Sequence, residues 1–392
     1  MQVLSRLYQS AFYIATPFLP WRTPELLEGP GTLKHLPALL QHRNLQRILV
    51  VTDAGVEQAG LLGPLLDLFE QKGMTVDVWK DVTPDPTSTQ AASLAEAVKR
   101  FDADAIAAVG GGSVIDCAKA ARALIARPDR SLSEMRGVLK IRRRGLFFAA
   151  VPTTAGTGSE ATAAAVITDA DTHEKYALID TCLIPDAAVL DAALTVQLPK
   201  RLTAAVGMDA LTHAVEAFIS RSRTNETDRH AAEAVRLLVK HLPIVYQNGD
   251  NLESRRLVLH AAHLAGLAFT KAFIGNVHAL AHQLGAQYRI PHGEANAMLL
   301  VPVLRQYGSR IYPRLEKLAA AAGLSQTDGA AFIELLNELR QSLDLPAGTE
   351  SLQTADYPAI SRAALREANP LYPVPVMFSE RDMYEVLRSI HL

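Results

Sequence analysis

The chain has 392 residues, a formal net charge of −2, 49% hydrophobic and 20% charged residues. A chain of this length is expected to form two domains with the composition of a globular protein, and its charge gives no reason to expect binding to nucleic acid or to an anionic membrane. Cys117 and Cys182 are its only cysteines. Without a disulfide framework, a membrane-length apolar run or a secretory leader, we expect a cytoplasmic protein.

The first 45 residues are rich in proline and are expected to be irregular, apart from a short helix that ends near residue 42. Short apolar runs then alternate with helical patterns, which is typical of a doubly wound α/β domain with a mostly parallel sheet. From about residue 194 helical periodicity dominates, with a last helix from Ser379. We therefore expect an α/β domain over residues 1–192 and an all-α domain over residues 193–392. The expected strands are 47–53, 75–79, 105–109, 146–151, 175–179 and 187–190.

Three consecutive glycines, residues 110–112, stand between an expected strand and an expected helix. Glycine lets the backbone approach a ligand closely, and the N-terminus of a helix attracts phosphate. The alternative is a tight turn in which Ser113 caps the helix and Asp116 assists it. This turn lacks the G-x-G-x-x-G pattern that an ordinary dinucleotide-binding domain carries after its first strand. The candidate cofactor-binding residues here are Gly111, Gly112, Ser113 and Asp116.

A second loop, residues 152–160, is rich in hydroxyl side chains and glycine and also follows a strand. Hydroxyl groups there suit hydrogen bonds to phosphate and ribose, and the alternative is an ordinary polar loop. Asp53, at the end of its strand, can accept a hydrogen bond from a ribose or can simply cap a helix. As a ribose ligand its charge would favour NAD over NADP. The further candidates are Thr153, Thr154, Thr157 and, as a point charge, Lys175.

Two histidine-containing pairs with helical spacing lie in the all-α half of the chain. Asp209 and His213 are four residues apart, as are His278 and His282, and His292 follows. Positions i and i+4 project from one face of a helix, so each pair can offer two ligands to one divalent metal. Spacing alone allows either His278 or His282 to be the ligand. A competing pair, His260 and His263, stands among leucines and is expected to be structural, whereas Glu216 is either a support for a ligand or a surface carboxylate.

These motifs together resemble the iron-containing (group III) alcohol dehydrogenase family. The matching segments are Gly-Gly-Gly-Ser-x-x-Asp-x-x-Lys at 110–119, Pro-Thr-Thr-x-Gly-Thr-Gly-Ser-Glu at 152–160, Gly-x-Asp-Ala-Leu-Thr-His-Ala-x-Glu at 207–216, His-x-x-x-His-x-Leu-Gly at 278–285 and Pro-His-Gly-x-Ala-Asn at 291–296. They cover nearly the whole chain in the family's order. Two segments depart from the family pattern: the opening 45 residues match loosely, and Leu371 stands where many members have arginine.

The resemblance implies a dehydroquinate synthase-like architecture, with an N-terminal dinucleotide-binding α/β domain and a helical metal-binding domain. It places the metal on Asp209, His213, His278 and His292, and leaves His282 near the nicotinamide as a catalytic, proton-relaying residue. Three imidazoles and one carboxylate suit Fe(II), with Zn or Mn as alternatives. The implied activity is hydride transfer between a primary or short-chain alcohol, or an aldehyde in reverse, and NAD(P), in a homodimer or larger homo-oligomer.

Two other functions stay open at this point. A polyol or glycerol dehydrogenase of the same superfamily shares the two-domain plan. An inactive nucleotide-binding regulatory or scaffold protein would keep the fold and lose the chemistry, which the complete set of ligand positions disfavours.

Overall fold

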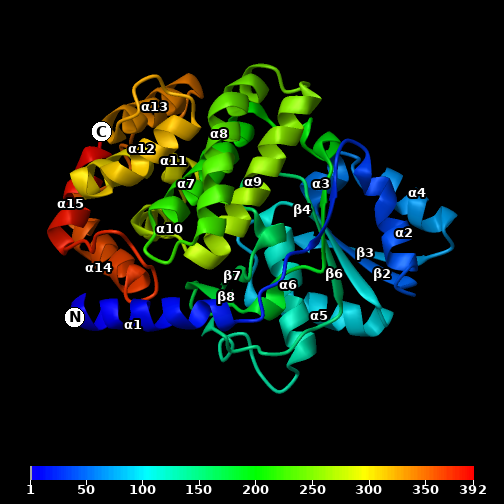
Figure 1. Ribbon diagram of the computed structural model, residues 1–392. Helices are drawn as coiled ribbons and strands as arrows, with labels where there is room; N and C mark the ends of the chain where they lie inside the picture. The colour runs from blue at the N-terminus through cyan, green and yellow to red at the C-terminus, as the bar shows by residue number, and fades with distance from the viewer. Residues whose placement is uncertain (1) are drawn as a thin grey trace. The chain divides into compact units, whose positions relative to one another are not determined.

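The computed structural model describes residues 2–392, without the side chains of residues 2, 3, 12, 15 and 17. By its contacts the chain divides into an α/β unit over Pro20–Gln197 and a helical unit that joins the residues up to Leu19 to Leu198–Leu392 (Figure 1). The sequence boundary at 192/193 stays a prediction. The contact division falls at Gln197 and Leu198, and it assigns the first residues to the helical unit rather than to the α/β unit.

The α/β unit is built on a six-stranded sheet in the order β1-β9-β6-β4-β2-β3, in which every pair is parallel. Its strands are β1 (Glu25–Glu28), β2 (Arg47–Asp53), β3 (Thr75–Val82), β4 (Ala105–Gly110), β6 (Phe147–Pro152) and β9 (Ala187–Leu190). Its helices are α2 (Leu36–Gln41), α3 (Ala54–Gln58), α4 (Gly63–Gln71), α5 (Ser88–Phe101) and α6 (Gly112–Ala126). The expected doubly wound parallel sheet is confirmed.

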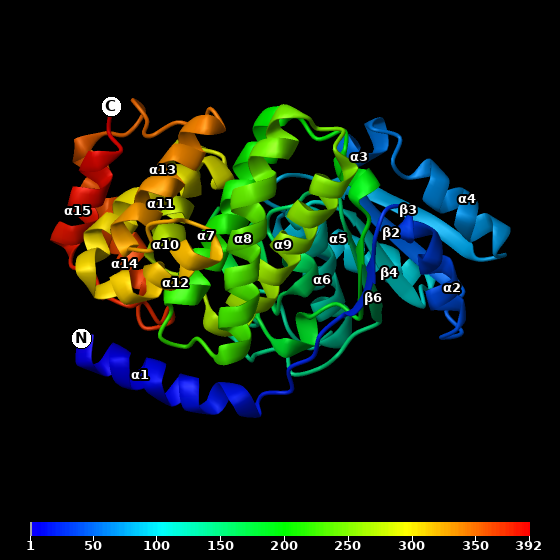
Figure 2. The same ribbon diagram turned by 45° about the horizontal axis from the view of Figure 1, so that its top comes forward.

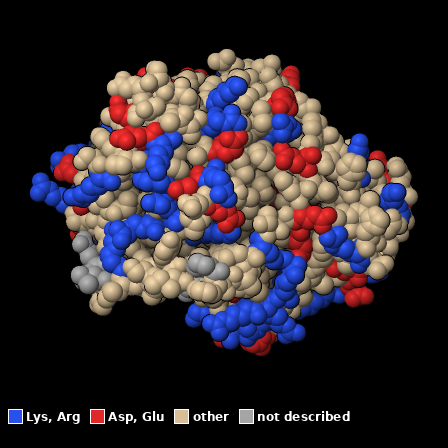
Figure 3. Space-filling view, viewed as in Figure 1, with Lys and Arg blue, Asp and Glu red and all other residues tan. Residues whose placement is uncertain are grey.

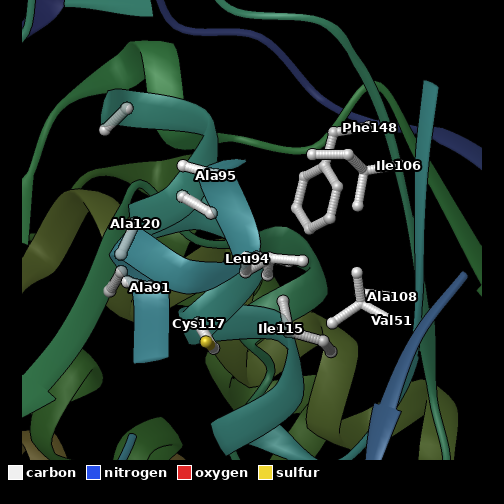
Figure 4. Packing of buried hydrophobic residues seen from close by; sticks show 14 of the residues in the cluster. Val51, Ala91, Leu94, Ala95, Ile106, Ala108, Ile115, Cys117, Ala120 and Phe148 are labelled. Atoms are coloured by element: carbon white, nitrogen blue, oxygen red, sulfur yellow. The ribbon is translucent and has the colours of Figure 1, made fainter. Parts of the chain in front are cut away.

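Both faces of this sheet are buried, which explains why its inner strands are apolar without alternation. Successive side chains of a strand point to opposite faces, so Val51 of β2 faces α5 and α6, whereas Val50 faces the opposite side with Phe69 of α4. Figure 4 shows the first cluster, with Leu94 and Phe148 packed together. Cys117 lies in this cluster, where burial raises the pKa of its thiol to about 12.

A smaller three-stranded sheet has the order β5-β8-β7, with β5 (Gly137–Val138), β8 (Lys175–Ile179) and β7 (Ala164–Thr168). The strand expected at 175–179 is therefore present but lies outside the main sheet. The loop that follows α6 carries exposed basic residues, and Figure 3 shows a dense group of Lys and Arg side chains in this region of the α/β unit. Positive charge is thus concentrated locally, which the net charge of −2 does not reveal.

The helical unit contains ten α-helices among the described residues. They are α1 (Gln2–Ala15), α7 (Lys200–Ile219), α8 (Asn225–Gln247), α9 (Leu252–Ala272), α10 (Asn276–Tyr288), α11 (His292–Tyr307), α12 (Tyr312–Ala321), α13 (Gly329–Ser342), α14 (Tyr357–Ala368) and α15 (Glu380–Ser389). Both views show α8 and α9 side by side (Figures 1 and 2). By length and composition α7 could cross a membrane, but 89% of its apolar window is buried, so it is a core helix.

The opening of the chain differs from the expectation of an irregular segment. Residues Gln2–Ala15 form α1, and Glu25–Glu28 form the edge strand β1, which pairs with β9. The polar side of α1 faces its own unit, since Arg6 donates to the carbonyl of Val374. The apolar side chains of Leu4, Leu7 and Ile14 are instead exposed. The prolines on which the expectation rested begin only after the helix, at Pro17.

Candidate metal centre and nucleotide-binding turns

The core helix α7 positions three of the candidate side chains. Asp209, His213 and Glu216 follow one another at intervals of four and three residues, so they project from one face of the helix. All three are buried. A helix that buries a carboxylate, an imidazole and a second carboxylate must supply partners for them, because uncompensated buried charge is strongly unfavourable.

Helices α10 and α11 bring two more imidazoles to Asp209. The Nε2 atom of His292 lies 3.4 Å from Asp209 Oδ1, and the Nε2 atom of His278 lies 3.7 Å from the same oxygen. One ligand atom from each of these three residues lies within 4.8 Å of the others. Ligand atoms bound to one ion at about 2.1 Å are separated by roughly 3–3.6 Å, so the spacing suits a metal better than direct hydrogen bonds.

His213, the fourth predicted ligand, lies beside this group rather than within it. Its ring stacks on His278, with centroids 4.4 Å apart, and on Phe269, with centroids 4.1 Å apart. Its Nδ1 atom is 4.0 Å from Asp209 Oδ2. The spacing of the Asp209–His213 pair on α7 therefore brings the imidazole to the carboxylate, and the coordinating role of His213 stays a prediction.

Two buried nitrogens at this centre, His213 Nδ1 and His278 Nε2, have no hydrogen-bond partner within the described part of the chain. Leaving such atoms unpaired is costly, and a cation among them would satisfy both. Burial lowers the pKa of His213 to about 3, which keeps the imidazole in its neutral, metal-binding form. Burial alone would raise the pKa of Asp209, but the neighbouring imidazoles outweigh it and hold that pKa well below its usual value. The residues therefore fit a divalent metal.

Glu216 supports one of the metal-ligand candidates directly. Its Oε2 atom lies 2.6 Å from His278 Nδ1, and its two oxygens accept hydrogen bonds from the backbone N–H groups of Gly275 and Val277. A carboxylate on Nδ1 holds the proton there and turns Nε2 toward the ion. The neighbouring position must be glycine, because a Cβ on Gly275 would lie 2.6 Å from Glu216 Oε1. Of the two roles that the sequence left open for Glu216, the structure favours the supporting one.

Asn296 is a neighbour of the metal centre that the sequence motifs contain but that we did not single out. Its Nδ2 atom donates to Asp209 Oδ1 over 2.7 Å. It lies four residues after His292 on α11, the same helical spacing that identified the ligand pairs. That spacing was the signal from which Asn296 could have been found in the sequence. Its neutral amide orients the Asp209 carboxylate and adds no charge to the site.

In the α/β unit the two predicted turns lie together at the carboxyl ends of neighbouring strands. Gly110 at the end of β4 pairs with Pro152 at the end of β6. A Cβ on Gly112 would lie 2.7 Å from Thr157 Cγ2, so only glycine allows this approach. In open parallel sheets, ligands bind beyond the carboxyl ends of the strands, which is where these turns lie.

The first turn presents the N-terminus of α6. The N-cap is Gly111, and no side chain of the described chain caps it. Ser113 lies inside the first helical turn, so the alternative that made it the cap is wrong. The uncapped N–H groups and the helix dipole fit an anionic ligand.

Asp116 and Lys119 of α6 connect the first turn to the second loop through hydrogen bonds. The carboxylate of Asp116 accepts hydrogen bonds from Ser159 Oγ and from the backbone N–H of Val166. The fully buried Lys119 ammonium donates to Ser159 and Thr162. Asp116 thus holds the second loop against α6, and this geometry favours an indirect role over direct contact with a cofactor.

Two other cofactor candidates have partners of their own. Asp53 caps α3, with its Oδ1 atom accepting from the N–H of Val56, and it stands at the carboxyl end of β2 next to β4. Lys175 begins β8 of the smaller sheet and forms an ion pair with Asp85 at 2.6 Å. Both stay predictions as cofactor ligands, and the structure brings Asp53, but not Lys175, to the edge of the main sheet that carries the glycine turn.

Comparisons with known proteins agree with these geometries. The family described as "Iron-containing alcohol dehydrogenase" matches residues 23–192, and "Fe-containing alcohol dehydrogenase family, C-terminal" matches residues 203–391. The "Probable alcohol dehydrogenase EutG" of Escherichia coli (strain K12) is 37% identical over 346 residues, which are 88% of this chain and 87% of that protein.

Two solved structures are similar throughout. An alcohol dehydrogenase from Oenococcus oeni gives a TM-score of 0.90 at 30% identity and covers 95% of this chain and 100% of its own. A 1,3-propanediol oxidoreductase gives a TM-score of 0.89 at 31% identity and covers 94% of this chain and 99% of its own. The parallel sheet with its glycine turns, the buried Asp–His centre and these matches lead to one conclusion. The chain belongs to the iron-containing alcohol dehydrogenase family and is an NAD(P)-dependent alcohol oxidoreductase.

Proposed function

We propose that Asp209, His213, His278 and His292 hold one divalent metal ion, Fe(II) in the native enzyme with Zn or Mn as substitutes, and that the substrate is a primary or short-chain alcohol. The observation that supports this most strongly is the buried group of Asp209, His278 and His292, whose nearest atoms lie within 4.8 Å and include an unpaired nitrogen. A hard carboxylate with imidazoles and no thiolate suits these metals.

The residues of this centre have different proposed roles. When bound, the metal supplies a Lewis acid that favours the ionised form of an alcohol and polarises a carbonyl in the reverse direction. Asp209 lowers the net charge of the site, and Glu216 and Asn296 fix the orientation of the ligands. His282, four residues after His278 on α10, receives the proton that an alcohol loses on oxidation. The His292 side chain is 41% exposed, so the centre is open on that side.

We also propose that the nicotinamide cofactor binds through the turns of the α/β unit, with NAD preferred over NADP. The uncapped N-terminus of α6 and the hydroxyls of Thr153, Thr154 and Thr157 suit the pyrophosphate and the ribose. Asp53 carries its negative charge at the carboxyl end of β2, where it would repel a 2′-phosphate. The contact of Gly112 with Thr157 supports the two turns acting as one site.

We propose further that the enzyme is cytoplasmic and a homo-oligomer. Both cysteines are free, which suits a reducing compartment. The exposed apolar side chains Leu4, Leu7 and Ile14 on α1 support an interface with a second copy, since such patches commonly mark association surfaces. Light scattering on the L4S/I14S double variant tests this: the enzyme should lose subunits, and an unchanged mass would contradict the role of α1.

One experiment tests the proposed chemistry. The purified enzyme is analysed for metals and assayed in both directions with NAD(H) and NADP(H) on short primary alcohols, diols, polyols and their aldehydes. We expect one divalent metal per chain and the highest kcat/KM with NAD and a short primary alcohol. Turnover that survives complete removal of metal would contradict the metal proposal, and the highest kcat/KM on glycerol would favour a polyol dehydrogenase.

A further inference from the structure

Glu367 contacts His282 although it lies in none of the motifs that the sequence offers. It stands in the last turn of α14, and its Oε1 atom is 2.5 Å from Nδ1 of His282 on α10. The two side chains are 24% and 26% exposed, so the contact is shielded from most of the solvent. Partial burial makes a charge-assisted hydrogen bond of this length stronger than it would be in water.

Two further donors fix the Glu367 carboxylate in place. The hydroxyl of Tyr372 donates to Oε1 over 2.9 Å, and Nε2 of Gln283 donates to Oε2 over 2.9 Å. Each carboxylate oxygen therefore has a partner, and the group cannot rotate without breaking a hydrogen bond. A carboxylate held on both sides gives the imidazole a fixed acceptor.

The segment that carries Tyr372 is itself held by α1. The Nε2 atom of Gln9 donates to the carbonyl of Tyr372 over 2.7 Å, and Arg6 donates to the carbonyl of Val374 over 2.7 Å. The first of these bonds is buried. Contacts thus run in sequence from α1 to Tyr372, then to Glu367 and then to His282, and all of these residues belong to the helical unit.

The ring of His282 lies beside the metal centre without joining it. It stacks on His292, with centroids 5.2 Å apart and planes 17° apart, and it meets His278 edge-on at 6.1 Å. Among the described residues His282 is outside the group whose ligand atoms lie within 4.8 Å. A proton held on Nδ1 by Glu367 leaves Nε2 as the hydrogen-bond acceptor of the ring.

We propose that Glu367 is a positioning residue for His282: its carboxylate accepts the Nδ1–H, fixes the ring and its tautomer, and leaves Nε2 ready to take the proton of the alcohol. This inference rests on the proton-accepting role proposed above for His282. Tyr372 and Gln283 serve the same purpose through Glu367.

The first test reads the tautomer directly. Long-range ¹H–¹⁵N spectra of ¹⁵N-histidine-labelled enzyme, as purified and with zinc, identify the His282 signals by their loss in His282→Ala. We expect the Nδ1–H tautomer in the native enzyme and in Glu367→Gln, whose amide oxygen can still accept. Glu367→Met keeps the chain length but removes the acceptor, and it should give a mixture of tautomers. The control Glu253→Met removes an exposed carboxylate that pairs with Arg256 and should change nothing.

The second test reads turnover. Glu367→Met should lower kcat by about 10- to 100-fold while metal content and KM for NAD stay unchanged, and Glu367→Gln should recover most of that loss. Tyr372→Phe should show a smaller loss, against Tyr288→Phe as a control that removes a tyrosine–carboxylate hydrogen bond elsewhere in the unit. If Glu367→Met does not fold, Glu367→Gln and Tyr372→Phe still carry the comparison.

The possible outcomes separate this inference from the proposed function. A native His282 tautomer in Glu367→Met overturns the positioning role whatever the turnover. A changed tautomer, with full kcat in both Glu367→Met and His282→Ala, supports the positioning role and overturns the proton-accepting role of His282. A changed tautomer with parallel losses of kcat in these two variants supports both.

Discussion

Replacing Glu216 with glutamine perturbs the metal centre without replacing any of the proposed metal ligands. The carboxylate accepts from His278 Nδ1 at 2.6 Å, from the N–H of Gly275 at 2.8 Å and from the N–H of Val277 at 2.9 Å. Glutamine offers one oxygen and one NH₂ group in the same space. The best orientation keeps the oxygen toward His278 and Gly275, and then the NH₂ group faces the N–H of Val277.

The magnitude follows from these contacts. The bond to His278 loses the assistance of a full charge, which makes it roughly half as strong, and one buried N–H loses its acceptor at a cost of about 1–3 kcal/mol in stability. Loss of a partner that orients a metal ligand typically weakens metal binding by about 10- to 100-fold, which corresponds to about 1.4–2.7 kcal/mol. We therefore expect Glu216→Gln to remain folded and to bind metal roughly 10- to 100-fold more weakly.

The assay is competition for the metal against a chromophoric chelator, with circular dichroism to verify the fold. Glu226→Gln is the matched control, because Glu226 is a half-exposed carboxylate that pairs with Lys271 on the helical unit's surface. The control should bind metal like the native enzyme. A folded Glu216→Gln variant with native metal affinity would refute the reasoning, since it would show that the carboxylate does not orient His278.

The remaining predictions address the other parts of the account. His278→Ala should lose its metal and lower turnover by about 100-fold or more while still binding NAD, as measured by elemental analysis and NADH fluorescence. Gly112→Ala should place a Cβ 2.7 Å from Thr157 Cγ2 and weaken NAD binding by about 5- to 100-fold, with metal content unchanged; native NAD affinity would show that the turns do not bind the cofactor. Burial raises the pKa of Asp186, but its arginine neighbours, Arg122 foremost, lower it more. A folded-state pKa below the unfolded one stabilises the protein above about pH 4, and this stability is lost as the pH falls through the folded-state pKa. The Tm of Asp186→Asn should therefore be lower than that of the native enzyme at pH 7. It should also fall less than the native Tm when the pH is lowered.

Much of the α/β unit was predictable because each of its inner strands carries a recognisable pattern within a short stretch of sequence. Segments such as 48–51 and 105–109 are continuous apolar runs, and a strand buried on both faces of a parallel sheet requires that pattern. The edge strand Glu25–Glu28 has only four residues and begins and ends with a glutamate, so it carries no such signal. Helix α1 was missed because the expectation of an irregular opening rested on the prolines of the first 45 residues, and the first of these, Pro17, follows the helix.

In the candidate site, too, contacts within one helix were predictable and contacts between helices were not. The i, i+4 spacing of Asp209 with His213 follows from helix geometry, so the carboxylate and the imidazole of that pair were predictable together. The contacts of Glu216 with His278, and of Glu367 with His282, join different helices. No spacing in the sequence determines which helices pack together, so these partners required the three-dimensional structure.

The most direct test of the central claim is the metal content of His282→Ala compared with that of His278→Ala, both purified from the same growth medium and measured per folded chain. The account predicts about one metal ion per chain in His282→Ala, as in the native enzyme, and almost none in His278→Ala. The opposite distribution would show that His282 is the ligand, and full metal content in both variants would show that the ion is not held at this centre.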